Sequence, residues 1–201
     1  MKTFTEVDEN RRINDFIRLF GRLIKEGCKN KKTICLQLSS GFDTRSVASV
    51  LLNLNIDFDV ISSNFSIKPV IDFSFAKTFC DTYNKILFRH NYKDKTMFMN
   101  GFYELCKETS DYDIVLSGLM MTEYINRYNF KARYCFKKYQ DDTLFYYHFP
   151  LYDKIMKDFG NLFLPILNVS LLNILRYIPY EYCKNSIIQK RIIKYYFKEL
   201  L

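Results

Sequence analysis

The stretch LQLSSGFDTRSVASVLL, residues 36–52, passes from an apolar run into two serines and a glycine, and then into a helical pattern. A strand, a short polar turn and a helix in this order can hold a phosphate, because backbone N–H groups and the helix dipole meet at the turn. The residues that carry this chemistry are Ser39, Ser40, Gly41, Asp43 and Thr44. A simpler interpretation is a helix N-cap, since Ser, Asp and Thr are favoured there for local reasons.

Each residue type in the turn has a use beside a phosphate. The hydroxyls of Ser39, Ser40 and Thr44 can donate hydrogen bonds, and Gly41 has no Cβ to block close approach. A carboxylate such as Asp43 makes sense beside phosphates only with a cation, for which Mg²⁺ is the first candidate. The turn is not a Walker loop, because the GxxxxGK(S/T) spacing and its lysine are absent.

Strand and helix patterns alternate over the first half of the chain. Apolar runs predict strands, and apolar spacing predicts helices between and before them. The expected strands are 33–38, 58–63, 85–90 and 112–118, and the expected helices are 10–27, 43–55, 70–83 and 95–108. This alternation predicts an α/β fold, a parallel sheet with helices on both faces.

We expect a single domain over residues 1–201, because this length suits one core. It would consist of an N-terminal helix in 1–30, an α/β nucleotide-binding core in 31–125 and a mainly helical C-terminal part in 126–201. No apolar run reaches the roughly 18 residues of a membrane span. The polar N-terminus has no signal-peptide core, so a cytoplasmic location is expected.

Cysteine spacing and charge exclude some classes of protein. The six cysteines contain no CxxC pair and the chain has only two histidines, which argues against a zinc knuckle or an iron–sulfur cradle. Reduced and mostly buried thiols are expected instead. The net charge of +8 would suit nucleic acid, but the Lys and Arg residues form no basic stripe, so nucleic acid is not the expected partner.

Five segments together resemble a known family. LSSGFDTR, residues 38–45, is similar to the SGGxD(S/T) pyrophosphate loop of the ATP-pyrophosphatase (PP-loop) superfamily, and most similar to the synthetase domain of asparagine synthetases. IDFSFAKTF resembles the family's acidic (D/E)xxxA helix, and IVLSGLMMTEYINRY resembles LSGEGADELFGGY. HFPLYDKIMKDFGNLFLP resembles RVPFLD with its downstream proline, and QKRIIKYYFKELL resembles the EKxxLRxAFxxxLP ending.

The resemblance implies an adenine nucleotide alpha hydrolase-like fold, ATP and Mg²⁺ as cofactors, and roles for individual residues. The turn from Ser39 to Thr44 would wrap the pyrophosphate, with Asp43 on Mg²⁺. Ser117 and Gly118 would form the facing edge of the nucleotide pocket. Lys190 falls where the family has its active-site lysine, whose charge would stabilise the negative charge that develops during adenylation.

Departures from the family pattern fall mostly outside the turn. Ser40 replaces the second glycine of the loop, and the LMM of residues 119–121 replaces EGA. Thr122 stands in place of the second metal-binding aspartate, which leaves Glu123 as the nearest carboxylate and a second candidate metal ligand. Tyr146 stands where the family has a glutamate that pairs with amine substrates.

These features predict an ATP-dependent amide or amine ligase-like enzyme. It would adenylate a small-molecule or peptide carboxylate, release pyrophosphate and transfer the acyl group to an amine or ammonia. Residue 2 is Lys and about 30 residues precede the first strand, too few for a glutaminase domain, so ammonia would be free or would come from a separate glutaminase. Two alternatives stay open: a degenerate nucleotide-binding protein without turnover, and a tRNA-modifying PP-loop enzyme, which the charge fits.

Overall fold

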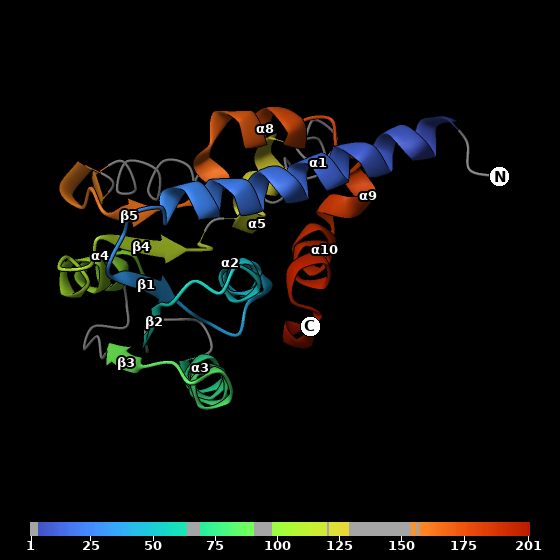
Figure 1. Cartoon of the computed structure of the whole chain (residues 1–201). Coiled ribbons are helices and arrows are strands. Elements are labelled where there is room, and N and C mark those ends of the chain that lie inside the picture. Colours follow the sequence, from blue (N-terminus) through green and yellow to red (C-terminus); the bar gives the residue numbers. More distant parts are fainter. Residues whose placement is uncertain (1–3, 64–68, 91–97, 120, 129–153, 156) are drawn as a thin grey trace.

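A computed structural model describes residues 4–63, 69–90, 98–119, 121–128, 154–155 and 157–201. Five parallel strands form one sheet in the order β3-β2-β1-β4-β5. The strands are β1 (Ile34–Gln37), β2 (Asp59–Ser63), β3 (Leu87–His90), β4 (Ile114–Ser117) and β5 (Leu162–Phe163). Figure 1 shows β5 and β3 at opposite edges of the sheet.

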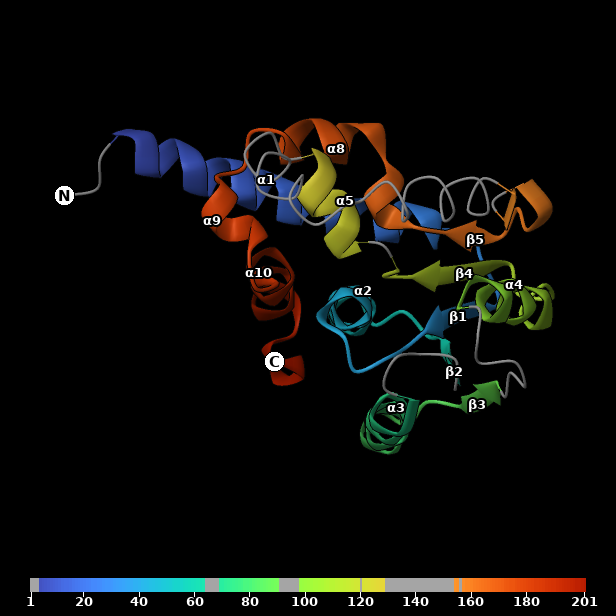
Figure 2. The same cartoon turned by 180° about the vertical axis from the view of Figure 1, so that it is seen from behind.

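Helices precede, connect and follow the strands. The α-helices are α1 (Phe4–Gly27), α2 (Phe42–Asn53), α3 (Pro69–Tyr83), α4 (Phe98–Glu108), α5 (Met121–Tyr128), α8 (Val169–Leu175), α9 (Tyr180–Cys183) and α10 (Ile187–Tyr196). In the part of the chain that the structure describes, the short 3₁₀ helices are η3 (Pro165–Leu167) and η4 (Lys198–Leu200). Figures 1 and 2 show α1 beside α8, with the C-terminal end of α1 near β5.

Helices cover both faces of the sheet. The chain moves from β1 to β2 and β3 in one direction, whereas β4 and β5 lie on the other side of β1. Because crossovers between parallel strands are right-handed, α2 and α3 lie on one face and α4 on the other. The side chain of Gln37 in β1 points to the α4 face, where its amide lies 3.9 Å from the Cys106 sulfur. The predicted α/β fold class is therefore confirmed.

The core forms where the sheet meets these helices. All four residues of β1 and of β4 are buried, as expected of parallel strands covered on both sides. The predicted N-terminal helix is present and begins earlier, at Phe4, and its face with Phe16 and Phe20 is buried in the same core. The C-terminal part packs back onto the α/β half, because α10 packs against α2 and Phe197 contacts the ring of Tyr83 in α3.

Within the described residues, no helix combines the length and the apolar character needed to cross a bilayer. The five described cysteines are all buried and none is in a disulfide. Burial raises the pKa of Cys28 and Cys80 to about 11 and that of Cys35, Cys106 and Cys183 to about 12, so these thiols stay protonated at neutral pH. The sixth cysteine, Cys135, lies outside the described residues.

Candidate functional site

The predicted turn joins β1 to α2 at the carboxyl edge of the sheet, where ligands of open α/β sheets bind. Thr44 braces it from the first turn of α2. Its hydroxyl oxygen accepts from the Ser39 N–H at 3.1 Å and lies 3.0 Å from the Ser39 carbonyl and 3.2 Å from the Gly41 carbonyl, either of which can accept its proton. The buried Thr44 hydroxyl therefore shapes the turn.

Side chains also accept from the other two amides of the turn. The Gly41 N–H donates to Ser39 Oγ at 3.3 Å. The Ser40 N–H donates to Asp72 Oδ1 at 2.8 Å, and the Ser40 hydroxyl donates to the same oxygen. Asp72 lies in the first turn of α3, within the segment that resembles the family's acidic helix.

The N-terminus of α2 is open. Gly41 is the N-cap residue in an extended conformation, and no side chain caps the helix. The first N–H groups of a helix have no partner within it, so those of Phe42 and Asp43 remain for a ligand. A Cβ on Gly41 would approach Ser39 Oγ, at 3.3 Å, and apart from the two flanking residues no other described atom lies within 4 Å of that position. The N-cap interpretation of the turn is therefore not supported.

The Asp43 carboxylate joins three distant segments of the chain. Its Oδ1 accepts from Gln189 Nε2 at 2.8 Å and from Thr122 Oγ1 at 2.9 Å, while Oδ2 accepts from the Thr122 N–H at 3.1 Å. Gln189 Nε2 also donates to Thr122 Oγ1 at 3.0 Å. Burial raises the pKa of Asp43, and the hydrogen bonds from Gln189 and Thr122 oppose that rise. The triangle fixes α2 against α5 and α10.

The predicted second loop lies directly against the turn. A Cβ on Gly118 would lie 2.3 Å from the carbonyl carbon and oxygen of Asp43 and 2.5 Å from the nitrogen of Thr44. Only a glycine allows these two backbones to approach so closely. The adjacent Ser117 is buried, and its hydroxyl accepts from the Leu119 N–H at 3.1 Å.

Two cations flank the first residue of α2. The Lys190 ammonium lies 4.8 Å from the centre of the Phe42 ring, and the Arg45 guanidinium lies 4.0 Å from the same ring. Arg45 also donates to the carbonyl of Leu200 at 3.0 Å, which ties α2 to the C-terminal segment. The structure thus brings Lys190 to the start of α2, next to the turn. Its catalytic role stays a prediction.

Some site residues could not be found from the sequence. Asp72 lies in the segment that resembles the family's acidic helix, but its spacing from the turn gives no sign of the contact with Ser40. Gln189 is 146 positions from Asp43, and Arg45 is 155 positions from Leu200, so no local pattern predicts either contact. Tyr146 lies outside the described residues, and so does the side chain of Glu123.

The donor set at Asp43 fits a magnesium ion only when phosphates complete it. Within the described ranges, no group of three or more His, Cys, Asp or Glu residues could hold a metal. Oδ1 of Asp43 accepts two hydrogen bonds but Oδ2 only one, which leaves this oxygen free to accept more. Mg²⁺ is commonly held by one or two carboxylates together with substrate phosphates and waters. Asp43 is thus the described residue that would hold it.

Comparison with known proteins gives a similarity in structure alone. No protein-family model matches the chain, and no curated protein sequence matches it. Among solved structures, the chain is similar to the U34-tRNA thiolase NcsA from Methanococcus maripaludis, a structure with its 4Fe–4S cluster. The two share 15% sequence identity over 93% of this chain and 80% of the thiolase, with a TM-score of 0.46.

Proposed function

We propose that this protein binds ATP at the start of α2 and cleaves it to AMP and pyrophosphate to activate a substrate, as PP-loop enzymes do. One observation carries the proposal. An uncapped helix N-terminus lies at the carboxyl edge of a parallel sheet, with Gly118 packed against it and the Lys190 ammonium beside it. Helix N-termini in this setting are anion sites.

Each group at the site would have a separate role in ATP binding and cleavage. The free amides at the start of α2 hold the phosphates, and Thr44 keeps the turn in shape. Lys190 supplies a fixed positive charge where negative charge develops as the α–β phosphate bond breaks. Magnesium, when bound with ATP, neutralises phosphate charge, and Asp43 would hold it. The Gln189 and Thr122 hydrogen bonds orient Asp43 for this role.

For the second substrate, we favour a carboxylate that becomes an acyl-adenylate and then passes to an amine or ammonia. The segments that resemble asparagine synthetases support this choice. A tRNA-modifying enzyme is the second candidate, supported by the net charge of +8. The described cysteines do not favour sulfur transfer, because burial keeps their thiols protonated. A binder without turnover is the third candidate, supported by Thr122 at the position of a family aspartate.

ATP binding itself is tested by Gly41→Val. Its φ of −69° suits any L-residue, and the added Cβ meets only the Ser39 hydroxyl, so the fold should survive. The branched side chain would fill the space that the phosphates need. Calorimetry should show ATP–Mg²⁺ binding by the natural chain and at least a roughly tenfold weaker affinity in the variant. Equal affinities would place the nucleotide elsewhere.

The three candidates for the reaction differ in pyrophosphate exchange. Labelled pyrophosphate should enter ATP when the protein meets a carboxylate that it can adenylate, because adenylation is reversible. Exchange only in the presence of tRNA would favour the second candidate. A protein that binds ATP but shows exchange with neither substrate class is the binder.

A further inference from the structure

The backbone N–H and the hydroxyl of Ser40, which we call the Ser40 corner of the turn, already bind a carboxylate of the protein itself, that of Asp72. Asp72 Oδ1 accepts from the Ser40 N–H at 2.8 Å and from the Ser40 hydroxyl. These are the two donors that a phosphate oxygen would use at this position. The Asp72 carboxylate therefore stands in the place of one phosphate oxygen.

Asp72 is well held in this position. It lies in the first turn of α3, where the helix dipole favours a negative charge, and it is only 7% exposed. Among the described residues, no basic side chain forms an ion pair with it; the three ion pairs found join Arg22 to Glu26, Lys77 to Asp81 and Lys85 to Asp57. Its charge is thus left to act on whatever binds at the turn.

A phosphate at the turn meets this charge directly. Two anions in neighbouring positions repel each other, and the repulsion is stronger where water is partly excluded. Both Ser40 donors are already bound to Asp72, whereas the amides at the start of α2 have no capping side chain. The phosphate must either displace Asp72 or bind at the α2 side alone.

We propose that Asp72 is an internal competitor for phosphate, which weakens binding at the Ser40 corner and directs the nucleotide toward the α2 N-terminus and Lys190. The inference rests on the proposed ATP site and adds a residue that sets its affinity. In this proposal Asp72 opposes phosphate binding, so removal of its charge should tighten the binding of pyrophosphate and ATP.

Two variants separate its charge from its hydrogen bonds. Asp72→Asn removes the charge and keeps an oxygen that can accept from Ser40, whereas Asp72→Ala also frees both Ser40 donors. Calorimetry with inorganic pyrophosphate and with ATP, each with Mg²⁺ and with EDTA, measures the effect. We expect roughly tenfold or greater tightening in both variants, since like charges that face each other across an interface oppose binding.

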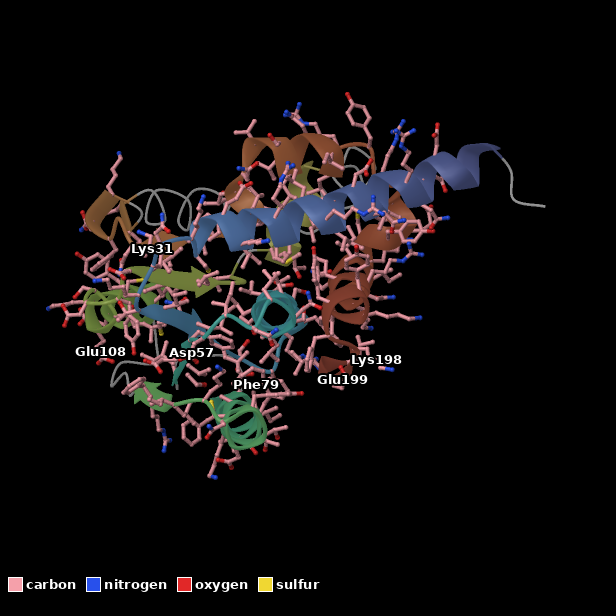
Figure 3. The ribbon with its side chains drawn as sticks, in the orientation of Figure 1. Lys31, Asp57, Phe79, Glu108, Lys198 and Glu199 are labelled. Atoms are coloured by element: carbon pink, nitrogen blue, oxygen red, sulfur yellow. The ribbon has the colours of Figure 1, made fainter. Side chains whose placement is uncertain are left out.

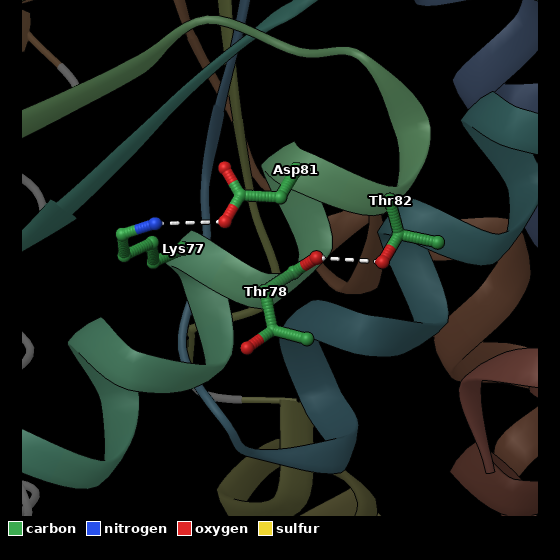
Figure 4. Close-up of polar contacts among 4 residues, drawn as sticks. All are labelled: Lys77, Thr78, Asp81 and Thr82. Carbon is green, nitrogen blue, oxygen red and sulfur yellow. Dashed lines mark hydrogen bonds and ion pairs between the residues drawn. The ribbon is translucent and has the colours of Figure 1, made fainter.

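Asp81→Asn is the matched control on the same helix. Asp81 is an exposed aspartate of α3 whose carboxylate pairs with Lys77 at 2.8 Å, and the Thr78–Thr82 hydrogen bond lies one residue further along the same helix (Figure 4). Its removal changes the net charge by the same amount as Asp72→Asn, so it reports any general charge effect. Its pyrophosphate affinity should stay within about twofold of the natural chain, because exposed charges are screened.

The outcomes separate this inference from the proposed function. If the natural chain binds pyrophosphate and both Asp72 variants bind it with the same or a weaker affinity, the inference is overturned and the ATP site stands. Weakening only with Mg²⁺ also overturns it, since Asp72 would then hold the cation. No binding by any of these proteins overturns both. If neither variant folds, Asp72→Ser decides, because it removes the charge and keeps a small oxygen that can accept from Ser40: tighter pyrophosphate binding supports the proposal, and equal or weaker binding contradicts it.

Discussion

Asp43 is the residue on which the site depends most. It is a carboxylate in a buried place, and the three hydrogen bonds that it accepts come from neutral groups of Thr122 and Gln189. A buried charge without a cationic partner is costly unless it is well hydrogen-bonded. The raised pKa of Asp43 shows that burial outweighs the hydrogen bonds. The folded protein therefore stores an unfavourable charge at the point where a cation and phosphates would gather.

We predict that Asp43→Asn changes how stability depends on pH. The pKa of Asp43 in the folded state lies above its ordinary value of 3.8, so the folded state binds the proton more tightly than the unfolded state. The contribution of Asp43 to stability is therefore present below pH 3.8 and lost as pH rises through the raised pKa. The free energy of unfolding of the variant, relative to the natural chain, should increase over this window, by about 1.4 kcal/mol for each pH unit that separates the two pKa values.

Asp57→Asn is the control with the opposite sign. The Lys85 ammonium lies 2.7 Å from the exposed Asp57 carboxylate and lowers its pKa, through the hydrogen bond first and the charge second. The contribution of Asp57 to stability is present above pH 3.8 and is lost as pH falls through the lowered pKa. The free energy of unfolding of Asp57→Asn, relative to the natural chain, should therefore decrease as pH rises through this window. Urea unfolding at a series of pH values measures both variants. Parallel slopes would mean that Asp43 is not a desolvated carboxylate.

At the scale of elements, α10 shows how packing assigns roles to a helix that looks ordinary in sequence. Ile188 and Ile192 are fully buried, and periodicity alone would place Lys190 on the exposed side. Because α10 packs against α2, Gln189 reaches Asp43 and Lys190 reaches Phe42. Lys194 and Lys198, in contrast, are exposed. The first turn of α10 therefore carries the contacts with the candidate site, whereas the lysines at and beyond its C-terminal end are exposed.

We predict that Lys190→Ala lowers turnover and not ATP affinity. A cation beside charge that develops during the reaction is worth on the order of 3–4 kcal/mol, or roughly 10²–10³ in rate. Pyrophosphate exchange should fall by about that factor, while the ATP dissociation constant stays within a few-fold. Lys198, labelled at the C-terminal end of the chain in Figure 3, provides the control, because Lys198→Ala should change neither quantity. Equal exchange rates for the two variants would remove Lys190 from catalysis.

At the scale of the whole molecule, the strands and helices of the first half could be predicted because their signals are local. The four expected strands appear as β1 to β4, each shorter than expected by one to three residues in all. The fifth strand, β5, could not be predicted, because two residues in an apolar stretch have no periodicity of their own. It exists because Val115 and Leu116 of β4 pair with Leu162 and Phe163.

The candidate site also has a part that the sequence could predict and a part that it could not. The turn was predictable, because strand, polar turn and helix follow one another within residues 34–53. Contacts between distant segments were not, since they depend on how α3, α5 and α10 pack around α2. Ser40 meets Asp72 across 32 positions, and Asp43 meets Thr122 across 79. Sequence patterns report periodicity and local chemistry, whereas such contacts are set by the tertiary fold.

We predict that ATP protects segments far apart in the chain and leaves another region unchanged. The turn, the Gly118 loop and α10 meet at Asp43, so a ligand that orders one of them orders all three. Hydrogen exchange should slow in residues 39–44, 117–122 and 187–190. At an ATP concentration about 100 times the dissociation constant, the gain is about 2.7 kcal/mol, or roughly a hundredfold in rate for amides that exchange by opening the site.

The matched region for this experiment lies at the amino ends of the strands. There Asp113 accepts from the Lys32 N–H at 2.6 Å and the Thr33 N–H at 3.1 Å, and the Asn161 amide donates to the Tyr112 carbonyl at 2.9 Å. Figure 3 shows Lys31, which precedes this corner, across the molecule from Lys198. Amides that exchange by local opening of the corner should keep their rates with ATP. Slowing in the turn with no change in α10 would show that the C-terminal helix takes no part in nucleotide binding, and Lys190 would then have no role beside the phosphates.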